Sequence, residues 1–185
     1  MAEEKIVAVF GSGVTESHEP DYKRAQELGS LLACRGYTIC CGGYRGIMEA
    51  VSRGAYECGG ETIGVTISAY GGANRWIKRE IVTESLFERL SHLLTLPRAY
   101  IIMNGGSGTL VEISLAWELS HKGAFKKTRP VIVAHQTWLQ VIEAIATLPA
   151  LHCRKSGHFP VPAPSFFYYE DMPDKIVALL EHLRI

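Results

Sequence analysis

The feature that most constrains the fold is a regular alternation of short apolar runs with segments of helical periodicity. The apolar runs are continuous, as in KIVAVF at residues 5–10, TICC at residues 38–41 and TIGVTI at residues 62–67. Strands of this kind are buried on both faces, and helical crossovers join parallel neighbours in such sheets. The pattern predicts a doubly wound α/β fold in which helices cover both faces of a mostly parallel sheet.

The expected elements follow one another along the whole chain, so we expect a single domain over residues 1–185. A polar, glycine-containing segment at residues 68–78 interrupts the alternation, and such loops often lie over a binding site. Residues 152–165 contain three prolines and are interpreted as an ordered surface loop. Strands are expected at residues 5–10, 38–41, 62–67, 80–83, 100–103, 129–134 and 166–169, and helices at residues 21–35, 46–58, 86–96, 110–121, 137–146 and 173–183.

Charge and composition exclude several classes of partner. Lys and Arg together number 19, as do Asp and Glu, so the net charge is zero and no basic field attracts nucleic acid. No apolar stretch approaches the ~20 residues of a membrane span. The N-terminal segment carries acidic residues where a signal peptide has basic ones, so none is expected. The five cysteines form no CxxC pair, and the seven histidines show no metal-binding spacing. We expect a cytoplasmic protein without a disulfide framework, metal or other cofactor, and with neither nucleic acid nor membrane as partner.

The strongest functional signal is YIIMNGGSGTLVE at residues 100–112, where a buried strand runs into glycines and a helix follows. Glycines let a ligand approach the backbone, and a helix N-terminus offers free N–H groups and the positive end of its dipole. Together they predict an anion site, although a tight turn without ligand is the alternative. A Walker A loop is excluded because the Lys-Ser/Thr ending is missing. The predicted anion-binding residues are Gly105, Gly106, Ser107, Gly108 and Thr109.

Glu112 has two interpretations. It lies three residues after Thr109, which is the spacing of a helix capping box. The carboxylate therefore either caps its own helix or stands one turn above a bound phosphate sugar, and the residue types alone leave both open.

Two further glycine turns follow predicted strands and should lie at the same edge of the sheet. Gly42 and Gly43 precede a predicted helix with Arg45 nearby, and Gly11 and Ser12 follow the first strand. Each turn either binds an anion or packs tightly without one, and we include all five residues in the candidate site. A dinucleotide fingerprint is absent because the first turn lacks the third glycine of G-x-G-x-x-G.

The two longer glycine segments resemble motifs of the Lonely Guy (LOG) family, long mislabelled as lysine decarboxylases. Residues 105–112, GGSGTLVE, are similar to its P-G-G-x-G-T-x-x-E motif, and residues 42–50, GGYRGIMEA, to its G-G-x-x-G-[LIV]-M segment. The similarity runs from residue 5 to about residue 134. Molybdenum-cofactor carrier proteins and DprA-like proteins share this fold and these glycine motifs.

The resemblance implies a Rossmann-like homodimer that hydrolyses cytokinin riboside 5′-monophosphates to free base and ribose 5-phosphate. In the family a Glu of the glycine motif and an Arg before it are catalytic, and Glu112 and Arg89 match them. We therefore expect a nucleoside 5′-monophosphate phosphoribohydrolase. The motif's proline is Asn104 here, and leucine follows Arg89 where the family has lysine. A non-catalytic carrier of a nucleotide or of the molybdenum cofactor thus stays open as the alternative, whereas no recognisable lysine context for pyridoxal phosphate supports a decarboxylase.

The predicted helices at residues 86–96 and 110–121 carry more apolar residues than one buried stripe requires. Two-fold pairing of like helices would cover the excess, so we expect a homodimer through these helices. Other helices of the same chain are the alternative cover. A charged substitution at Trp117 is expected to shift such a dimer towards monomer.

Overall fold

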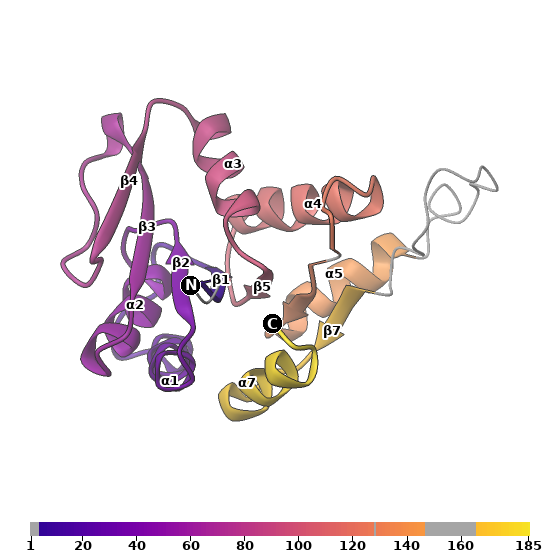
Figure 1. Ribbon diagram of the computed structural model, residues 1–185, viewed down its shortest axis with the longest axis horizontal. Coiled ribbons are helices and arrows are strands. Elements are labelled where there is room, and N and C mark those ends of the chain that lie inside the picture. The colour runs from indigo at the N-terminus through magenta and orange to yellow at the C-terminus, as the bar shows by residue number, and fades with distance from the viewer. Residues whose placement is uncertain (1–3, 128, 147–165) are drawn as a thin grey trace.

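The computed structural model describes residues 4–127, 129–146 and 166–185 of the chain. The strands are β1 (Ile6–Phe10), β2 (Thr38–Cys41), β3 (Thr62–Ile67), β4 (Arg79–Thr83), β5 (Ala99–Ile102), β6 (Val131–Val133) and β7 (Phe167–Tyr169). The helices are α1 (Pro20–Cys34), α2 (Ile47–Glu57), the 3₁₀ turn η1 (Ser68–Tyr70), α3 (Leu86–Thr95), α4 (Ser107–His121), α5 (Gln136–Ala146) and α7 (Pro173–His182). Among the described residues, the strands form one sheet in the order β4-β3-β2-β1-β5-β6-β7 (Figure 1).

Every neighbouring pair of strands in this sheet is parallel, which confirms the doubly wound α/β fold. The expected strands and helices are all present, with bounds that differ by a few residues at most. The largest difference is α4, which begins at Ser107 and not at residue 110. The first N–H groups of a helix need no partner within it, so Ser107 and Gly108 adopt helical geometry at little cost. The segment at residues 152–165, expected as a surface loop, lies outside the described residues.

The sheet has a separate apolar core on each face, because successive strand side chains point to opposite sides. Val7 and Val9 of β1 pack in the core formed with α1, α2 and α7. Ile6, Ala8 and Phe10 pack in the other core, which includes residues of α3, α4 and α5. Figure 1 shows α1, α2 and α7 together on one side of the sheet and α3, α4 and α5 on the other.

The expectation for the apolar helices α3 and α4 needs one correction. Trp117 is only 8% exposed in the single chain, and its ring packs edge-on against Phe167 with centroids 4.9 Å apart. It therefore belongs to the chain's own core and is no direct test of a dimer contact. The apolar side chains that these two helices leave exposed are instead Leu86, Phe87, Leu110 and Val111.

The order of the strands also fixes where the loops meet. β1 lies between β2 and β5, and from β1 the chain builds the sheet outwards first in one direction and then in the other. The loops after β1 and β5 thus leave adjacent strands towards opposite faces. Ligands of doubly wound sheets bind in the crevice that forms at such a switch point, beyond the carboxyl ends of the strands.

Candidate anion-binding and catalytic site

The glycine turns after β1, β2 and β5 are tied together at the switch point. The backbone N–H of Ser12 donates to the carbonyl of Asn104 at 2.7 Å, which joins the loops after β1 and β5. The N–H of Ile47, the first residue of α2, donates to the carbonyl of Ser12 at 2.8 Å. Gly46 has a φ of +67°, and a Cβ there would overlap the Ser12 carbonyl. Only glycine meets both conditions, so this residue allows the close approach of the two loops.

The loop after β5 has the geometry of an open anion cradle. Gly106 is the N-cap of α4, so the free N–H groups of the first turn belong to the glycine loop itself. Gly106, Ser107 and Gly108 are exposed, and a Cβ built on either glycine would have nothing within 4 Å. The space above these N–H groups is therefore accessible, as anion binding at a helix N-terminus requires.

Thr109 and Gly105 hold the cradle in shape from below. Thr109 is buried, and its side chain lies where a Cβ on Gly105 would be. Its hydroxyl oxygen lies beside Gly105 and packs against the loop. A contact of Thr109 with a phosphate stays a prediction.

Arg89 reaches from α3 back to the sheet and is fixed there by three neighbours. Its Nε donates to the carbonyl of Val65 in β3 at 2.8 Å, and its guanidinium lies 5.6 Å from the centre of the Tyr44 ring. A Cβ on Gly42 would overlap the guanidinium. Gly42 therefore serves the site by leaving room for Arg89, and the hydrogen bond and ring contact orient the guanidinium.

Glu112 is a buried carboxyl group in the second turn of α4. Its side chain is only 7% exposed, although it carries a titratable carboxyl group. Burial raises its pKa to about 8, and the positive charge of Arg89 opposes the rise. A titratable group with such a shift, close to a specific charged partner, is typical of catalytic sites.

The capping-box interpretation of Glu112 is wrong. The N-cap of α4 is Gly106, no side chain caps the helix there, and Thr109 is its third residue. Glu112 is therefore too far along the helix to bond the N-cap. At 1.5 Å per residue it lies about 7.5 Å along the axis from Ser107, beyond the cradle.

The other predicted residues occupy different places. Gly43 has a φ of +78° and packs against Gly64 of β3, so it shapes the turn after β2. Arg45 is exposed and lines a hollow of about 650 Å³ beside the turn, together with Tyr70 and Arg75. Gly11 packs against Ile47, where a Cβ would lie 2.6 Å from that side chain. Gly11 and Gly43 thus allow the loops to pack closely together. Arg45 lies at the surface beside the turn after β2.

Tyr44 and Asn74 were not among the residues predicted for the site. Asn74 Nδ2 donates to the carbonyls of Gly43 and Tyr44 at 3.0 and 2.7 Å, and the Asn74 N–H also donates to Gly43 at 2.7 Å. The Tyr44 hydroxyl accepts a hydrogen bond from the N–H of Ile67 at 2.8 Å. The segment at residues 68–78 therefore clamps the turn that supports Arg89. The signal in the sequence for these residues is the expectation that the segment at residues 68–78 lies over a binding site.

The described part of the chain carries neither a metal cluster nor a membrane-spanning helix. Within residues 4–127, 129–146 and 166–185, no three His, Cys, Asp or Glu side chains gather as a metal site would require. No helix within the same ranges has the length and apolar character needed to cross a membrane.

Comparison with known proteins identifies relatives of the whole site region. Residues 4–147 match the SLOG cluster4 family. A cytokinin riboside 5′-monophosphate phosphoribohydrolase of Mycobacterium tuberculosis is 33% identical over 131 residues, covering 69% of this chain and 68% of that protein. An uncharacterised protein of Archaeoglobus fulgidus is 30% identical over 127 residues, covering 69% of this chain and 82% of its own.

Solved structures share the fold. The molybdenum cofactor binding protein from Rippkaea orientalis superposes with a TM-score of 0.75 at 21% identity and covers 100% of both chains. DNA processing protein A from Streptococcus pneumoniae superposes with a TM-score of 0.60 at 16% identity, covering 95% of this chain and 61% of its own. The chain belongs to the SLOG cluster4 family, within the Rossmann-like superfamily of the Lonely Guy enzymes.

Proposed function

We propose that the protein hydrolyses the N-glycosidic bond of nucleoside 5′-monophosphates, releasing the free base and ribose 5-phosphate. The observation that carries the proposal is the buried carboxyl of Glu112, near the charge of Arg89 and on the helix whose N-terminus forms the open cradle. The 33% identical relative from Mycobacterium tuberculosis, named as a phosphoribohydrolase, supports the same reaction.

The substrate's 5′-phosphate binds at the first turn of α4. Free N–H groups and the positive end of the helix dipole attract an anion there without any need for net positive charge on the protein. The open space at Gly106 and Gly108 admits the phosphate oxygens. With its phosphate held at the start of α4, the sugar extends along the helix towards Glu112.

Glu112 acts on the water that attacks the sugar. Glycosidic cleavage passes through an oxocarbenium-like state, in which the bond from the anomeric carbon to the base nitrogen breaks as the bond to water forms. An ionised Glu112 accepts the proton of that water and stabilises the positive charge on the sugar. The departing base nitrogen takes up one proton, so that one water is consumed for each bond broken. A pKa of about 8 suits this exchange of a proton near neutral pH.

Arg89 fixes the substrate or assists the departing base. Its Nε donates a hydrogen bond to the carbonyl of Val65. The two outer nitrogens of the guanidinium, which lies beside Gly42, remain for the ligand. No step requires a metal or a redox cofactor.

Product analysis with AMP tests the reaction. We expect release of adenine and ribose 5-phosphate by the parent protein and a fall of about 10²–10⁴-fold in Glu112→Gln at unchanged fold. Glu118→Gln is the matched control, because Glu118 is an exposed carboxylate of the same helix. A parent protein that binds nucleoside monophosphates but releases no base from any of them contradicts the proposal and favours a non-catalytic carrier.

The working unit in this proposal is a homodimer. Leu86 and Phe87 of α3 and Leu110 and Val111 of α4 are exposed apolar side chains on neighbouring helices. A second copy placed against them would cover this surface by two-fold symmetry. Arg89 and Glu112 belong to the same two helices, so the contact would lie close to the site.

A further inference from the structure

Two exposed cysteines lie together where α1 and α2 end, away from the candidate site. Cys34 is the last residue of α1, and Cys58 follows α2 directly. Both helices lead into strands of the sheet, so their ends lie at the amino ends of those strands. The glycine turns lie at the carboxyl ends. The chemistry of the cysteine pair is thus independent of the proposed reaction.

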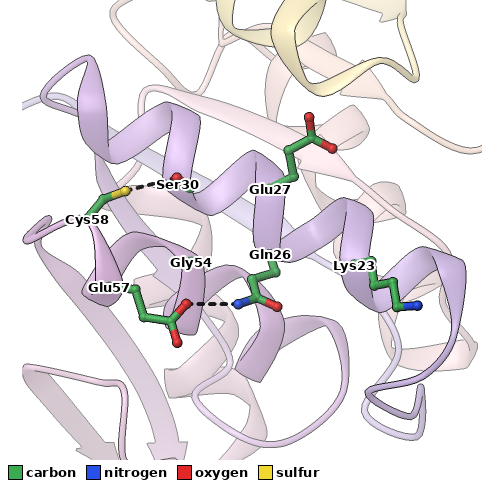
Figure 2. Close-up of a pocket in the computed structure, with 7 residues that line it drawn as sticks. All are labelled: Lys23, Gln26, Glu27, Ser30, Gly54, Glu57 and Cys58. Atoms are coloured by element: carbon green, nitrogen blue, oxygen red, sulfur yellow. Dashed lines mark hydrogen bonds between the residues drawn. The ribbon is translucent and has the colours of Figure 1, made fainter.

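The side chain of Cys58 reaches across the groove between the two helices to the face of α1 that carries Cys34. Cys58 Sγ lies 2.9 Å from Ser30 Oγ, which Figure 2 shows as a contact from one helix to the other. Cys34 is four residues after Ser30 on α1 and therefore lies on the same face, one turn further along. The Cys58 thiol is the neighbour that does most to raise the pKa of Cys34.

The backbones that carry the two thiols are held close by glycine contacts. A Cβ on Gly29 would overlap the carbonyl of Val51, and a Cβ on Gly54 would overlap the carbonyl of Gln26. Near the cysteines, a Cβ on Gly60 would overlap the side chain of Ala33. The helices thus pack backbone against backbone, and this close packing extends to the ends that carry the two cysteines.

The described cysteines differ in their access to oxidants. Cys40 and Cys41 lie within β2 and are fully buried, and burial raises the pKa of both thiols. Buried thiols of this kind are inert towards reagents in solution. Cys34 and Cys58 are exposed, and each has the other thiol as an immediate neighbour.

We propose that Cys34 and Cys58 are a reversible redox modification site, at which low-molecular-weight disulfides such as glutathione disulfide close an intramolecular Cys34–Cys58 disulfide. The thiolate of one cysteine attacks a sulfur of the small disulfide, forming a mixed disulfide and releasing one small thiolate. The thiolate of the other cysteine then attacks the protein sulfur of that mixed disulfide and releases the second. Two protein thiols are oxidised, one small disulfide is reduced to two thiols, and the protein's two protons pass to them.

The experiment uses glutathione disulfide as the probe. Cys153 lies outside the described residues, so it is replaced by serine in every variant. Because the neighbouring Cys58 thiol raises the pKa of Cys34, the incubation is done at about pH 8.5, where thiolates form readily. Intact mass and peptide mapping under denaturing conditions locate the products, and thermal unfolding reports their effect.

We expect a mass loss of two hydrogen atoms, a linked pair of peptides containing Cys34 and Cys58, and a Tm raised by about 5 °C or more, all reversed by a reductant. Cys34→Ser and Cys58→Ser are both at exposed positions and should each stop at the mixed disulfide with glutathione. Cys41→Ser is the control in which the link should still form. Two stable glutathione adducts, at Cys34 and Cys58 of the Cys153→Ser protein, or a link only between separate chains, would overturn the proposal.

Discussion

The replacement Glu112→Gln should change the stability of the protein in a way that depends on pH. Glutamine keeps the size of the side chain and removes its charge. Burial raises the pKa of Glu112 from 4.5 to about 8 in the folded chain, whereas in the unfolded chain the carboxyl keeps its ordinary pKa. The folded state therefore disfavours the ionised form, and the parent protein loses stability as pH rises from about 4.5 to about 8. Above about pH 8 the loss is constant, because the carboxyl is ionised in both states.

The size of the effect follows from the shift itself. One pKa unit corresponds to 1.36 kcal/mol, so the ceiling of the penalty is roughly 5 kcal/mol. Relaxation around the ionised group reduces it, and we expect a measured difference of about 2–4 kcal/mol in favour of Glu112→Gln at about pH 8.5. At about pH 4.5 the two proteins should differ by less than ~1 kcal/mol, because the carboxyl is mostly neutral in the parent.

Urea unfolding at the two pH values measures this difference. Glu118→Gln is the control on the same helix, because that exposed carboxylate pairs with Lys122 at 3.5 Å and should show a small effect. A difference between parent and Glu112→Gln that is the same at both pH values would refute the reasoning. It would mean that Glu112 is solvated or paired in the folded protein and does not titrate near neutrality.

Three further substitutions test the cradle, the arginine and the assembly. Gly106→Val places a side chain in open space and should change the Tm of the free protein by no more than a few degrees, while removing the stabilisation by AMP in a thermal-shift assay. If AMP stabilises the variant as much as the parent, the phosphate binds elsewhere. Gly42→Ala should displace Arg89 and lower the rate of ribose 5-phosphate release by about 10-fold or more in a folded protein, and an unchanged rate would remove Arg89 from the reaction. Light scattering should give the parent a mass of about twice 20.4 kDa, and Phe87→Glu, at a side chain 85% exposed in the single chain, should reduce this mass towards that of one chain. A parent mass of 20.4 kDa at micromolar concentration would contradict the dimer.

The fold was predictable from sequence because its strands are continuous apolar runs. TICC and TIGVTI predict buried parallel strands without any knowledge of their neighbours, and β2 and β3 have the predicted bounds. α4 begins three residues before its predicted start, because the sequence pattern assigns the glycines and the serine of residues 105–108 to the turn. The first turn of a helix accepts these residues readily, since its N–H groups have no partners to lose.

The environment of Arg89 and Glu112 was not predictable from the chain. Arg89 is fixed by the carbonyl of Val65 and the ring of Tyr44, which are far from it in sequence. Thr109 and Glu112 have the spacing of a capping box, but this spacing has its meaning only where the threonine is the N-cap. The helix begins before Thr109, so this threonine lies within the first turn and the capping-box spacing does not apply to it.

The position of Arg89 explains how the cradle and the buried carboxyl can work on one ligand. An anion at the first turn of α4 adds negative charge on the side of Glu112, and this charge alone would keep the carboxyl protonated. Arg89 supplies the opposing positive charge, and its neighbours Gly42, Tyr44 and Val65 hold it in one orientation. A lysine would not reproduce this arrangement, because its ammonium lacks the planar fork that bonds the Val65 carbonyl along one edge and faces a ligand with the other. In the proposed reaction the turn after β2 therefore acts through the arginine: it sets the place of Arg89, whose positive charge opposes the rise that burial causes in the pKa of Glu112.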